Sequence, residues 1–254
     1  MNKKKSALVC IAKNEDHYIK EWIEYHTKLG FDKIFIYQND WRCNLEHPNI
    51  TKYELDGYGK QTEAYNFFIR DHHTEYEWAA FFDVDEFLVL KKHQRINDFL
   101  EEYKQYPALG IGWYFFGTNG HEVVKDNNYS VIDRFTKRRN ILDKFFKSII
   151  KLDKEVVMDV HSRHGSTYFT NGKEVMTGRE EDCDAEVAQL NHYFVKTIDE
   201  FKAKVSRGLA CLRPADDGYI RSMDYFPHHN NNEVDDFHAF NFKHDIIQNT
   251  QNNK

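Results

Sequence analysis

Residues 78–90, WAAFFDVDEFLVL, are the part of the sequence from which the fold prediction starts. The apolar run WAAFF ends abruptly at the acidic sequence DVDE. A short, uninterrupted apolar run is typical of a strand that is buried on both faces of an open α/β sheet. Ligands of such sheets bind beyond the carboxyl ends of the strands. The stretch therefore predicts a buried strand that presents Asp83, Asp85 and Glu86 to a ligand-binding crevice.

The two aspartates of this stretch predict a site for a divalent cation. Asp83 and Asp85 are two residues apart, and in an extended chain that spacing points both side chains the same way. Hard oxygen ligands suit Mg²⁺ or Mn²⁺, which bind few protein carboxylates and complete their shells with water and substrate phosphates. The alternative is a strand end capped by solvated acids. The strand before the pair and the EFL sequence after it favour the metal site.

The chain before this stretch alternates between predicted strands and helices. Strands are expected at residues 6–11, 33–37 and 50–55, and helices at residues 19–30 and 59–70. This order predicts a parallel-rich sheet flanked by helices, as in nucleotide-binding proteins. The sequence has neither GxGxxG after the first strand nor GxxxxGK followed by Ser or Thr, which argues against a dinucleotide oxidoreductase and a P-loop enzyme.

The chain after this stretch has shorter and less regular elements. A helix is expected at residues 94–106, and a final helix opens with a capping box of Thr197 and Glu200. Short strands are expected at residues 111–116, 131–135, 146–152, 156–160, 167–170 and 190–195. Beyond Pro214 the periodic pattern dissolves, and residues 248–254 are expected to form a mobile tail. One compact fold with two lobes is favoured over two independent domains.

The composition indicates a soluble globular protein that does not bind nucleic acid. The chain has 254 residues, of which 41% are hydrophobic and 30% are charged. Its net charge of −6 argues against nucleic acid as a partner, because aromatic side chains need a basic groove to bind it. No apolar run reaches transmembrane length and no signal peptide is visible. Membrane contact is therefore expected to be peripheral at most, through residues 3–5, KKK.

The cysteines favour a cytosolic protein. They are scattered without a CxxC pair, at Cys10, Cys43, Cys183 and Cys211. This distribution fits reduced thiols better than a disulfide framework or a zinc site.

Polar residues at other strand ends are candidates for the same crevice. Asn14 and Asn39 each follow a predicted strand and suit either a helix cap or a contact to a base or ribose. Gln61, Tyr65 and Asn66 fit an ordinary amphipathic helix equally well.

Candidates for chemistry also occur in the second half. His192, at a strand end, is the preferred third metal ligand, and Lys196 could contact a phosphate, although lone histidines and lysines are more often structural or solvated. The turn at residues 117–120 leads into His121 and Glu122, which either form a polar exit or supply a general base.

These segments, taken in order, resemble glycosyltransferase family 92, within the GT-A-fold enzymes. The similarity runs from residue 6 to about residue 208 and includes VCIAKNEDHYIKEWIEYHTKLGFDKIFIYQND, QTEAYN, WAAFFDVDEFL, GWYFFGTNGH, KSIIK, VHSRHG and NHYFVKTIDEFKAKVSRG. The resemblance implies a GT-A-type, Rossmann-like mixed sheet with a smaller acceptor-side lobe. It divides the chain into a domain at 1–214, with a nucleotide-sugar half at 6–110 and an acceptor half at 111–214, and a partly mobile extension at 215–254.

The resemblance also implies an activity. It predicts an inverting, Mn²⁺- or Mg²⁺-dependent transfer of a hexose, by default galactose, from a UDP-sugar to a glycan or glycolipid acceptor. The expected location is cytoplasmic or peripheral at the inner face of the membrane, in surface polysaccharide, lipopolysaccharide or capsule assembly. The alternatives are a non-catalytic sugar-nucleotide-binding module and a phosphotransferase or phosphatase that uses the aspartate pair.

The residue roles that follow are implied by the resemblance. Asp83, Asp85 and His192 would hold the metal. The donor nucleotide would be bound by Ala12, Asn14, Glu15, Asn39, Gln61, Tyr65, Asn66, Asp83 and Lys196. The candidates for the base that deprotonates the acceptor are Glu122, His121, Asp159 and Glu86.

Overall fold

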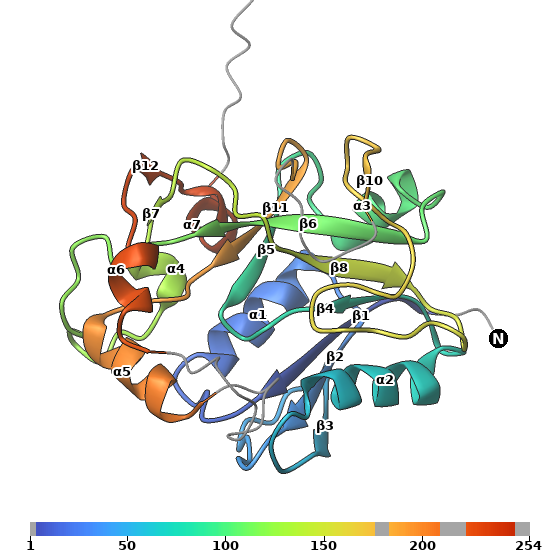
Figure 1. The fold of residues 1–254 in the computed structure, drawn as a ribbon, viewed down its shortest axis with the longest axis horizontal. Coiled ribbons are helices and arrows are strands. Elements are labelled where there is room, and N and C mark those ends of the chain that lie inside the picture. Colours follow the sequence, from blue (N-terminus) through green and yellow to red (C-terminus); the bar gives the residue numbers. More distant parts are fainter. Residues whose placement is uncertain (1–3, 176–182, 209–221, 247–254) are drawn as a thin grey trace, which may run out of the picture.

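The computed structural model describes residues 4–175, 183–208 and 222–246 (Figure 1). Cys211 and the tail predicted at residues 248–254 lie outside these ranges. Cys10 and Cys43 are buried free thiols. In the described ranges, no helix combines the length and the apolar character that crossing a membrane requires.

A large mixed sheet forms the centre of the molecule (Figure 1). Across the sheet the strands are β10 (Glu174–Val175), β9 (Thr167–Tyr168), β6 (Ala108–Phe115), β8 (Phe146–Lys151), β4 (Tyr76–Phe81), β1 (Lys4–Ala12), β2 (Lys33–Gln38) and β3 (Ile50–Glu54). Strands β4, β1, β2 and β3 are parallel, and β8 is antiparallel to both β4 and β6. Strand β11 (Ala188–His192) runs parallel to β6 and antiparallel to β5 (Glu86–Leu90).

Helices cover both faces of the parallel half of this sheet. Helix α1 (Ile19–Leu29) and α3 (Ile96–Glu102) lie on one face and α2 (Gln61–His72) lies on the other (Figure 1). Alternation along β1 explains this arrangement, because Leu8 and Cys10 join the core with α1 whereas Ala7, Val9 and Ile11 join the core with α2. The predicted mixed α/β sheet flanked by helices is thus confirmed.

Two predicted strands have a different structure. Residues 131–134 form helix α4 (Val131–Arg134), because the Ser130 side chain accepts a hydrogen bond from the Asp133 amide and caps the turn. Residues 156–160 form only an isolated bridge from Met158 to Arg163. The backbone N–H and C=O of Met158 bond instead to the side chain of Asn66, at 2.9 Å each.

The region beyond Pro214 has regular structure although its sequence shows no periodic pattern. It forms α6 (Tyr225–His229), β12 (Val234–Asp235) and α7 (His238–Lys243). Strand β12 pairs with β7 (Lys137–Arg138). Lys243 binds Glu21 of α1 and Asp133 of α4, at 2.8 and 2.7 Å. This segment therefore packs on the main fold, and the division at residue 214 stays a prediction.

Candidate active site

The two aspartates lie in a tight turn between β4 and β5, and they do not point the same way. Strand β4 ends at Phe81, so the extended geometry assumed for Asp83 and Asp85 does not hold. The Glu86 amide donates to the Asp83 carbonyl at 3.0 Å, and the Glu86 carboxylate accepts from the Asp83 amide at 2.9 Å. This reciprocal pair closes the turn and directs the two aspartates to different partners.

Each carboxylate oxygen of Asp83 accepts a hydrogen bond from a different element of the fold. Its Oδ1 accepts a hydrogen bond from Gln61 at 2.9 Å and its Oδ2 one from Lys147 at 3.1 Å. Gln61 also donates to the Tyr65 hydroxyl at 2.9 Å, so three predicted donor-binding residues form one network. Burial would lower the pKa of Lys147, but Asp83 and Glu86 outweigh it and raise that pKa above its ordinary value. Lys147 is therefore a permanent, buried cation.

Asp85 is buried among cationic and imidazole groups. Its Oδ2 contacts the Lys204 ammonium and lies 3.6 Å from His192 Nε2 and 4.0 Å from Lys196 Nζ. Burial would raise the pKa of Asp85, but Lys204, His192 and Lys196 overcome that effect and hold the pKa well below its ordinary value. Asp85 is therefore an anion that the protein already neutralises.

His192 is brought to Asp85 by strand pairing and is a neutral imidazole. It pairs with Glu86 in the β11–β5 ladder, and the next residue, Tyr193, donates its amide to the Asp85 carbonyl at 2.9 Å. Burial lowers the pKa of His192, so its 3.6 Å contact with Asp85 is not an ion pair. Its Nδ1 is buried and has no hydrogen-bond partner. A neutral ring is the form that binds metals.

Helix α5 (Ile198–Ser206) positions Lys204 and follows directly after Lys196. The capping box predicted for Thr197 and Glu200 is confirmed. Glu200 also forms a buried pair with Arg134 at 2.7 Å. Lys196 has a left-handed backbone, with φ of 53°, which is costly for a residue with a side chain and typical of functional sites. Burial lowers the pKa of Lys196.

The loop after β1 meets the end of α5. Glu15 pairs with Arg207 at 2.5 Å, and Arg207 also donates to the Lys13 carbonyl at 3.0 Å. Asn14 has a φ of 54°, so its predicted helix-cap role is wrong; Tyr18 is the residue that precedes α1. This junction joins the first strand to the residues that surround Asp85.

Two of the side-chain amides predicted to bind the nucleotide are instead hydrogen-bonded to the protein backbone. Asn39 donates to the carbonyls of Leu55 and Gly57, at 2.9 and 2.7 Å. Asn66 bonds to Met158, as described above. Ala12 is buried at the end of β1. Recognition of a nucleotide by the side chains of Asn39 and Asn66 would therefore require these hydrogen bonds to break.

The candidate bases lie on exposed loops or deep in the core. Glu122 and Asp159 are exposed, and His121 packs edge-on against Phe135, with ring centroids 5.9 Å apart. Glu86 is fully buried, and burial raises its pKa well above the ordinary value. The described residues include no hydrogen bond or ion pair that joins His121, Glu122 or Asp159 to Asp83 or Asp85.

The chemistry of the site fits a divalent cation only in part. Asp85 and His192 are adjacent and of the correct ligand types. Within the described ranges, however, no three His, Cys, Asp or Glu side chains are grouped closely enough to hold a metal, and Asp83 is not part of such a group. Two protein ligands are compatible with a metal that is completed by substrate phosphates. The Lys204 ammonium would first have to leave Asp85.

Sequence reasoning missed several residues of the site, including Lys147, Lys204 and Arg207. Each lies in a stretch that carried the family resemblance, KSIIK or FKAKVSRG. A lysine inside the apolar strand FKSIIK is the clearest available signal, because a buried lysine requires an anionic partner. The partner itself could not be identified from spacing, since Lys147 and Asp83 are 64 residues apart.

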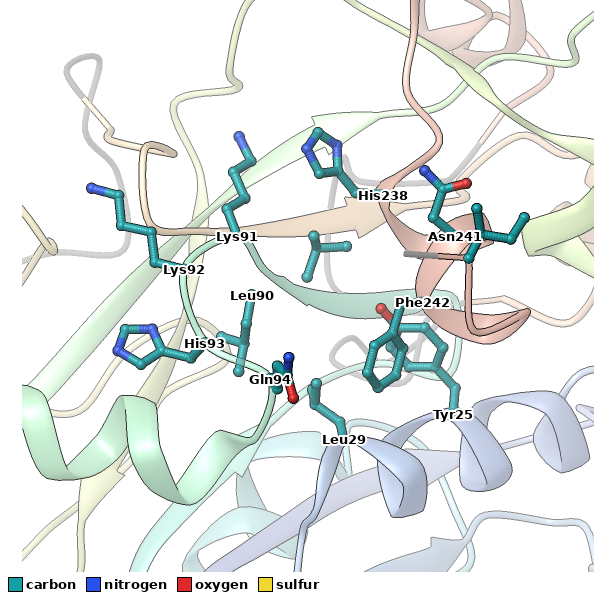
Figure 2. A pocket seen from close by; sticks show the side chains of 12 residues that line it. Tyr25, Leu29, Leu90, Lys91, Lys92, His93, Gln94, His238, Asn241 and Phe242 are labelled. Carbon is teal, nitrogen blue, oxygen red and sulfur yellow. The ribbon is translucent and has the colours of Figure 1, made fainter. Parts of the chain in front are cut away.

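A separate pocket of about 300 Å³ lies at the far end of β5 from Asp85 (Figure 2). Tyr25, Leu29, Leu90 and Phe242 form its apolar wall, and Lys91 lies at its rim. Asp85 precedes the first residue of β5, whereas this pocket surrounds the last one. The pocket is therefore not part of the aspartate site.

Comparisons with solved structures give only distant similarities. A manganese complex of Rv0371c from Mycobacterium tuberculosis is 6% identical, with 44% of this chain and 66% of that chain covered and a TM-score of 0.34. A putative glucose-1-phosphate thymidylyltransferase from Bacillus anthracis is 12% identical, with 62% and 68% covered and a TM-score of 0.32. These scores are too low to support any inference.

Sequence comparisons are more specific. Glycosyltransferase family 92 proteins of Oryza sativa subsp. japonica and Ricinus communis are each 26% identical to the chain, over 81% and 76% of its length. The chain spans 36% of the length of each of these relatives. The family model described as Glycosyltransferase family 92 matches residues 46–250, which is most of the chain. The chain therefore belongs to glycosyltransferase family 92.

Proposed function

We propose that this chain is a hexosyltransferase that uses a UDP-sugar, by default UDP-galactose, and inverts the anomeric centre. The acceptor would be a glycan or lipid-linked saccharide in surface polysaccharide, lipopolysaccharide or capsule assembly, and the location cytoplasmic or peripheral at the membrane. Family membership supports glycosyl transfer. The observation that carries the proposal is the buried Asp85 carboxylate, which lies at the carboxyl end of the parallel strands among Lys204, His192 and Lys196.

The donor would lie across the carboxyl ends of β1 and β4. Gln61, Tyr65 and Asp83 form a hydrogen-bonded network there, which suits recognition of the ribose hydroxyls. Ala12, Asn14 and Glu15 complete the nucleotide side of the site, with Glu15 held by Arg207. This assignment places the diphosphate near Asp85.

The main chemical requirement of the reaction is neutralisation of the negative charge on the departing diphosphate. Asp85 and His192 would hold Mn²⁺ or Mg²⁺, with Asp83 as a further predicted contact. When bound, such a metal supplies Lewis-acid stabilisation of the departing diphosphate. Lys196 would contribute a positive charge from the protein itself. Its ammonium is nearly buried, lies 4.6 Å from the centre of the Tyr18 ring and is 4.0 Å from Asp85.

A base must accept the proton of the attacking hydroxyl. We assign this general base to Glu122, with His121 beside it. The loop that carries both residues is held in place by the C-terminal segment. The amides of Thr118 and Asn119 donate to the side chains of Asn230 and Asn232, at 2.8 and 2.7 Å. Asp159 is the alternative, since its side chain is exposed as well.

Release of UDP from a panel of UDP-hexoses in the presence of Mn²⁺ tests the proposal. We expect one UDP-hexose to be hydrolysed slowly, and Asp85→Asn to reduce that rate by about 10³-fold, as loss of a key electrostatic group does. Asp98→Asn, which changes an exposed acid on α3, is the matched control and should retain the parent rate.

Two results would contradict the proposal. Asp85→Asn hydrolysing at the parent rate would remove Asp85 from the chemistry. Binding of UDP without release from any UDP-hexose, with or without saccharide acceptors, would instead identify a non-catalytic sugar-nucleotide-binding module.

A further inference from the structure

The pocket at the far end of β5 has an apolar wall that three elements build together. Tyr25 and Leu29 come from α1, Leu90 from β5 and Phe242 from α7 (Figure 2). The Tyr25 and Phe242 rings meet edge to face, with centroids 5.1 Å apart, and the Tyr25 hydroxyl donates to the Leu88 carbonyl at 2.9 Å. The wall therefore offers apolar contact, because its hydroxyl group is already bonded to the backbone. A pocket of about 300 Å³ is large enough for a small ligand.

Two ammonium groups lie beside this wall, and neither forms an ion pair with an acid in the part of the chain that the structure describes. Lys91 is half-buried, and its Nζ donates to the Ala185 carbonyl at 2.7 Å. Burial lowers the pKa of Lys91, although Asp236 acts against that effect. Lys92 is exposed. Of the described residues that line the pocket, none is an aspartate or a glutamate. The pocket therefore carries positive charge without an acid in contact with it.

Asp236 is not available as the counterion of Lys91. Its buried carboxylate already accepts hydrogen bonds from Arg138 at 2.7 Å, Gln189 at 2.9 Å and the His238 ring at 2.8 Å. A half-buried ammonium group is more stable when an anion contacts it. The counterion of Lys91 must therefore come from the solvent or from a ligand.

An apolar wall next to these cations selects a ligand that has both an apolar and an anionic part. An alkyl chain would cover Leu29, Leu90 and Phe242 and remove their surface from water. An anionic head group would contact Lys91, with Lys92 adding attraction from the entrance. A small inorganic anion would leave the wall exposed, and a neutral apolar ligand would leave Lys91 without a counterion. Carboxylate and phosphate head groups both satisfy the requirement.

We propose that this pocket binds a single-chain anionic amphiphile, with its alkyl chain against the apolar wall and its head group on Lys91. The inference does not rest on the proposed function, because the pocket and Asp85 lie at opposite ends of β5. It assigns a ligand class to a cavity that glycosyl transfer at the aspartates does not use.

Titration calorimetry of the full chain with dodecanoate tests the proposal without any variant. We expect one dodecanoate to bind per chain, and each methylene removed from it to weaken binding by about fourfold. Dodecyltrimethylammonium, which has the same chain and the opposite charge, should bind at least about tenfold more weakly. Absence of dodecanoate binding would overturn the proposal, and so would equal affinities for the anionic and the cationic amphiphile.

Removal of one charge locates the head group. Lys91→Met keeps the length of the side chain and should weaken dodecanoate binding by at least about tenfold. Lys154→Met is the matched control, because this exposed lysine does not line the pocket, and it should bind dodecanoate as the parent does. A folded Lys91→Met variant with the affinity of the parent would overturn the assignment of the head group to this lysine.

Flotation with vesicles of phosphatidylcholine and phosphatidylglycerol distinguishes the two sources of such a ligand. Vesicle binding that dodecanoate reverses and Lys91→Met weakens supports the pocket as a site for a membrane lipid. Dodecanoate binding without vesicle binding supports it as a site for a free amphiphile. Vesicle binding that is unaffected by Lys91→Met, in a protein that does not bind dodecanoate, would place membrane contact elsewhere and overturn the proposal.

Discussion

The two halves of the sheet contribute opposite charges to the candidate site. The parallel half supplies carboxylates, because Asp83 and Asp85 follow β4. The other half supplies the cations and the imidazole, with Lys147 on β8, His192 on β11 and Lys204 on α5. At this edge of the sheet, the carboxylates of one half are neutralised by the cations of the other half. The comparison shows that the site is held together by charge complementarity between segments that are distant in the sequence.

The direction of one strand explains how these charges meet. Strand β8 is antiparallel to β4, and Ala80 pairs with Ile149. The beginning of β8, which carries Lys147, is therefore placed beside the end of β4, which leads to Asp83. A parallel strand at this position would place its first residues at the opposite edge of the sheet. The switch from parallel to antiparallel pairing thus delivers a buried cation to the carboxylates.

The largest expected effect on stability comes from removal of Lys147. Lys147→Met leaves Asp83 and the fully buried Glu86 without their cation, and loss of one partner of a buried pair costs about 3 kcal/mol or more. Urea unfolding followed by circular dichroism measures this loss. In the double variant with Asp83→Asn, the part of the loss that the unpaired Asp83 charge causes should be recovered. If the two effects simply add, the charges of the two halves are not coupled.

Glu200→Gln should have the next largest effect, about 2 kcal/mol at neutral pH, because the Glu200–Arg134 pair is buried. Burial would raise the pKa of Glu200, but hydrogen bonds from Arg134 and Thr197 lower it from 4.5 to about 2. A lowered folded pKa adds stability that is complete above the unfolded value and is lost as the pH falls toward the folded value. The difference between parent and variant should therefore shrink between about pH 5 and pH 2. A difference that stays constant over that range would show that the carboxylate charge is not involved.

The smallest of these effects should come from a neutral network in the parallel half. Asn39→Ala removes hydrogen bonds to the carbonyls of Leu55 and Gly57 and should cost about 1 kcal/mol, the usual net contribution of neutral hydrogen bonds. Thermal unfolding measures the loss. This variant serves as the neutral counterpart of Lys147→Met, and an equal loss in both would remove the contrast between the two halves.

The predictions from sequence were most successful where the pattern is local. The predicted strands at residues 6–11, 33–37 and 50–55 are present as β1, β2 and β3. β1 and β2 are mostly buried, whereas β3 is largely half-buried or exposed, and each is bounded by clear turn signals, so each could be recognised from a few residues. The prediction of a strand at residues 131–135 was wrong because the Asp133 amide donates a capping hydrogen bond to the Ser130 hydroxyl, which stabilises a short helix in a segment with β-branched residues.

The site was predicted less completely than the fold. Asp85 and His192 are close together, as expected, and Gln61, Tyr65 and Asp83 share a network. Lys204 was not predicted as a partner of Asp85, although these residues are in contact across 119 positions of sequence. Spacing in a sequence reveals partners within one element, whereas pairs from different elements depend on the register of the sheet.

The sequence by itself determined the alternation of elements, the acidic residues after a buried strand and the family to which the chain belongs. These features depend on local hydrophobic periodicity and on short motifs, which the linear order of residues contains in full. Only the tertiary structure decided that Asp83 and Asp85 face different partners and that a lysine from α5 neutralises Asp85. The physical reason is that burial of a charge requires a partner in space, and that partner is selected by strand direction and helix packing.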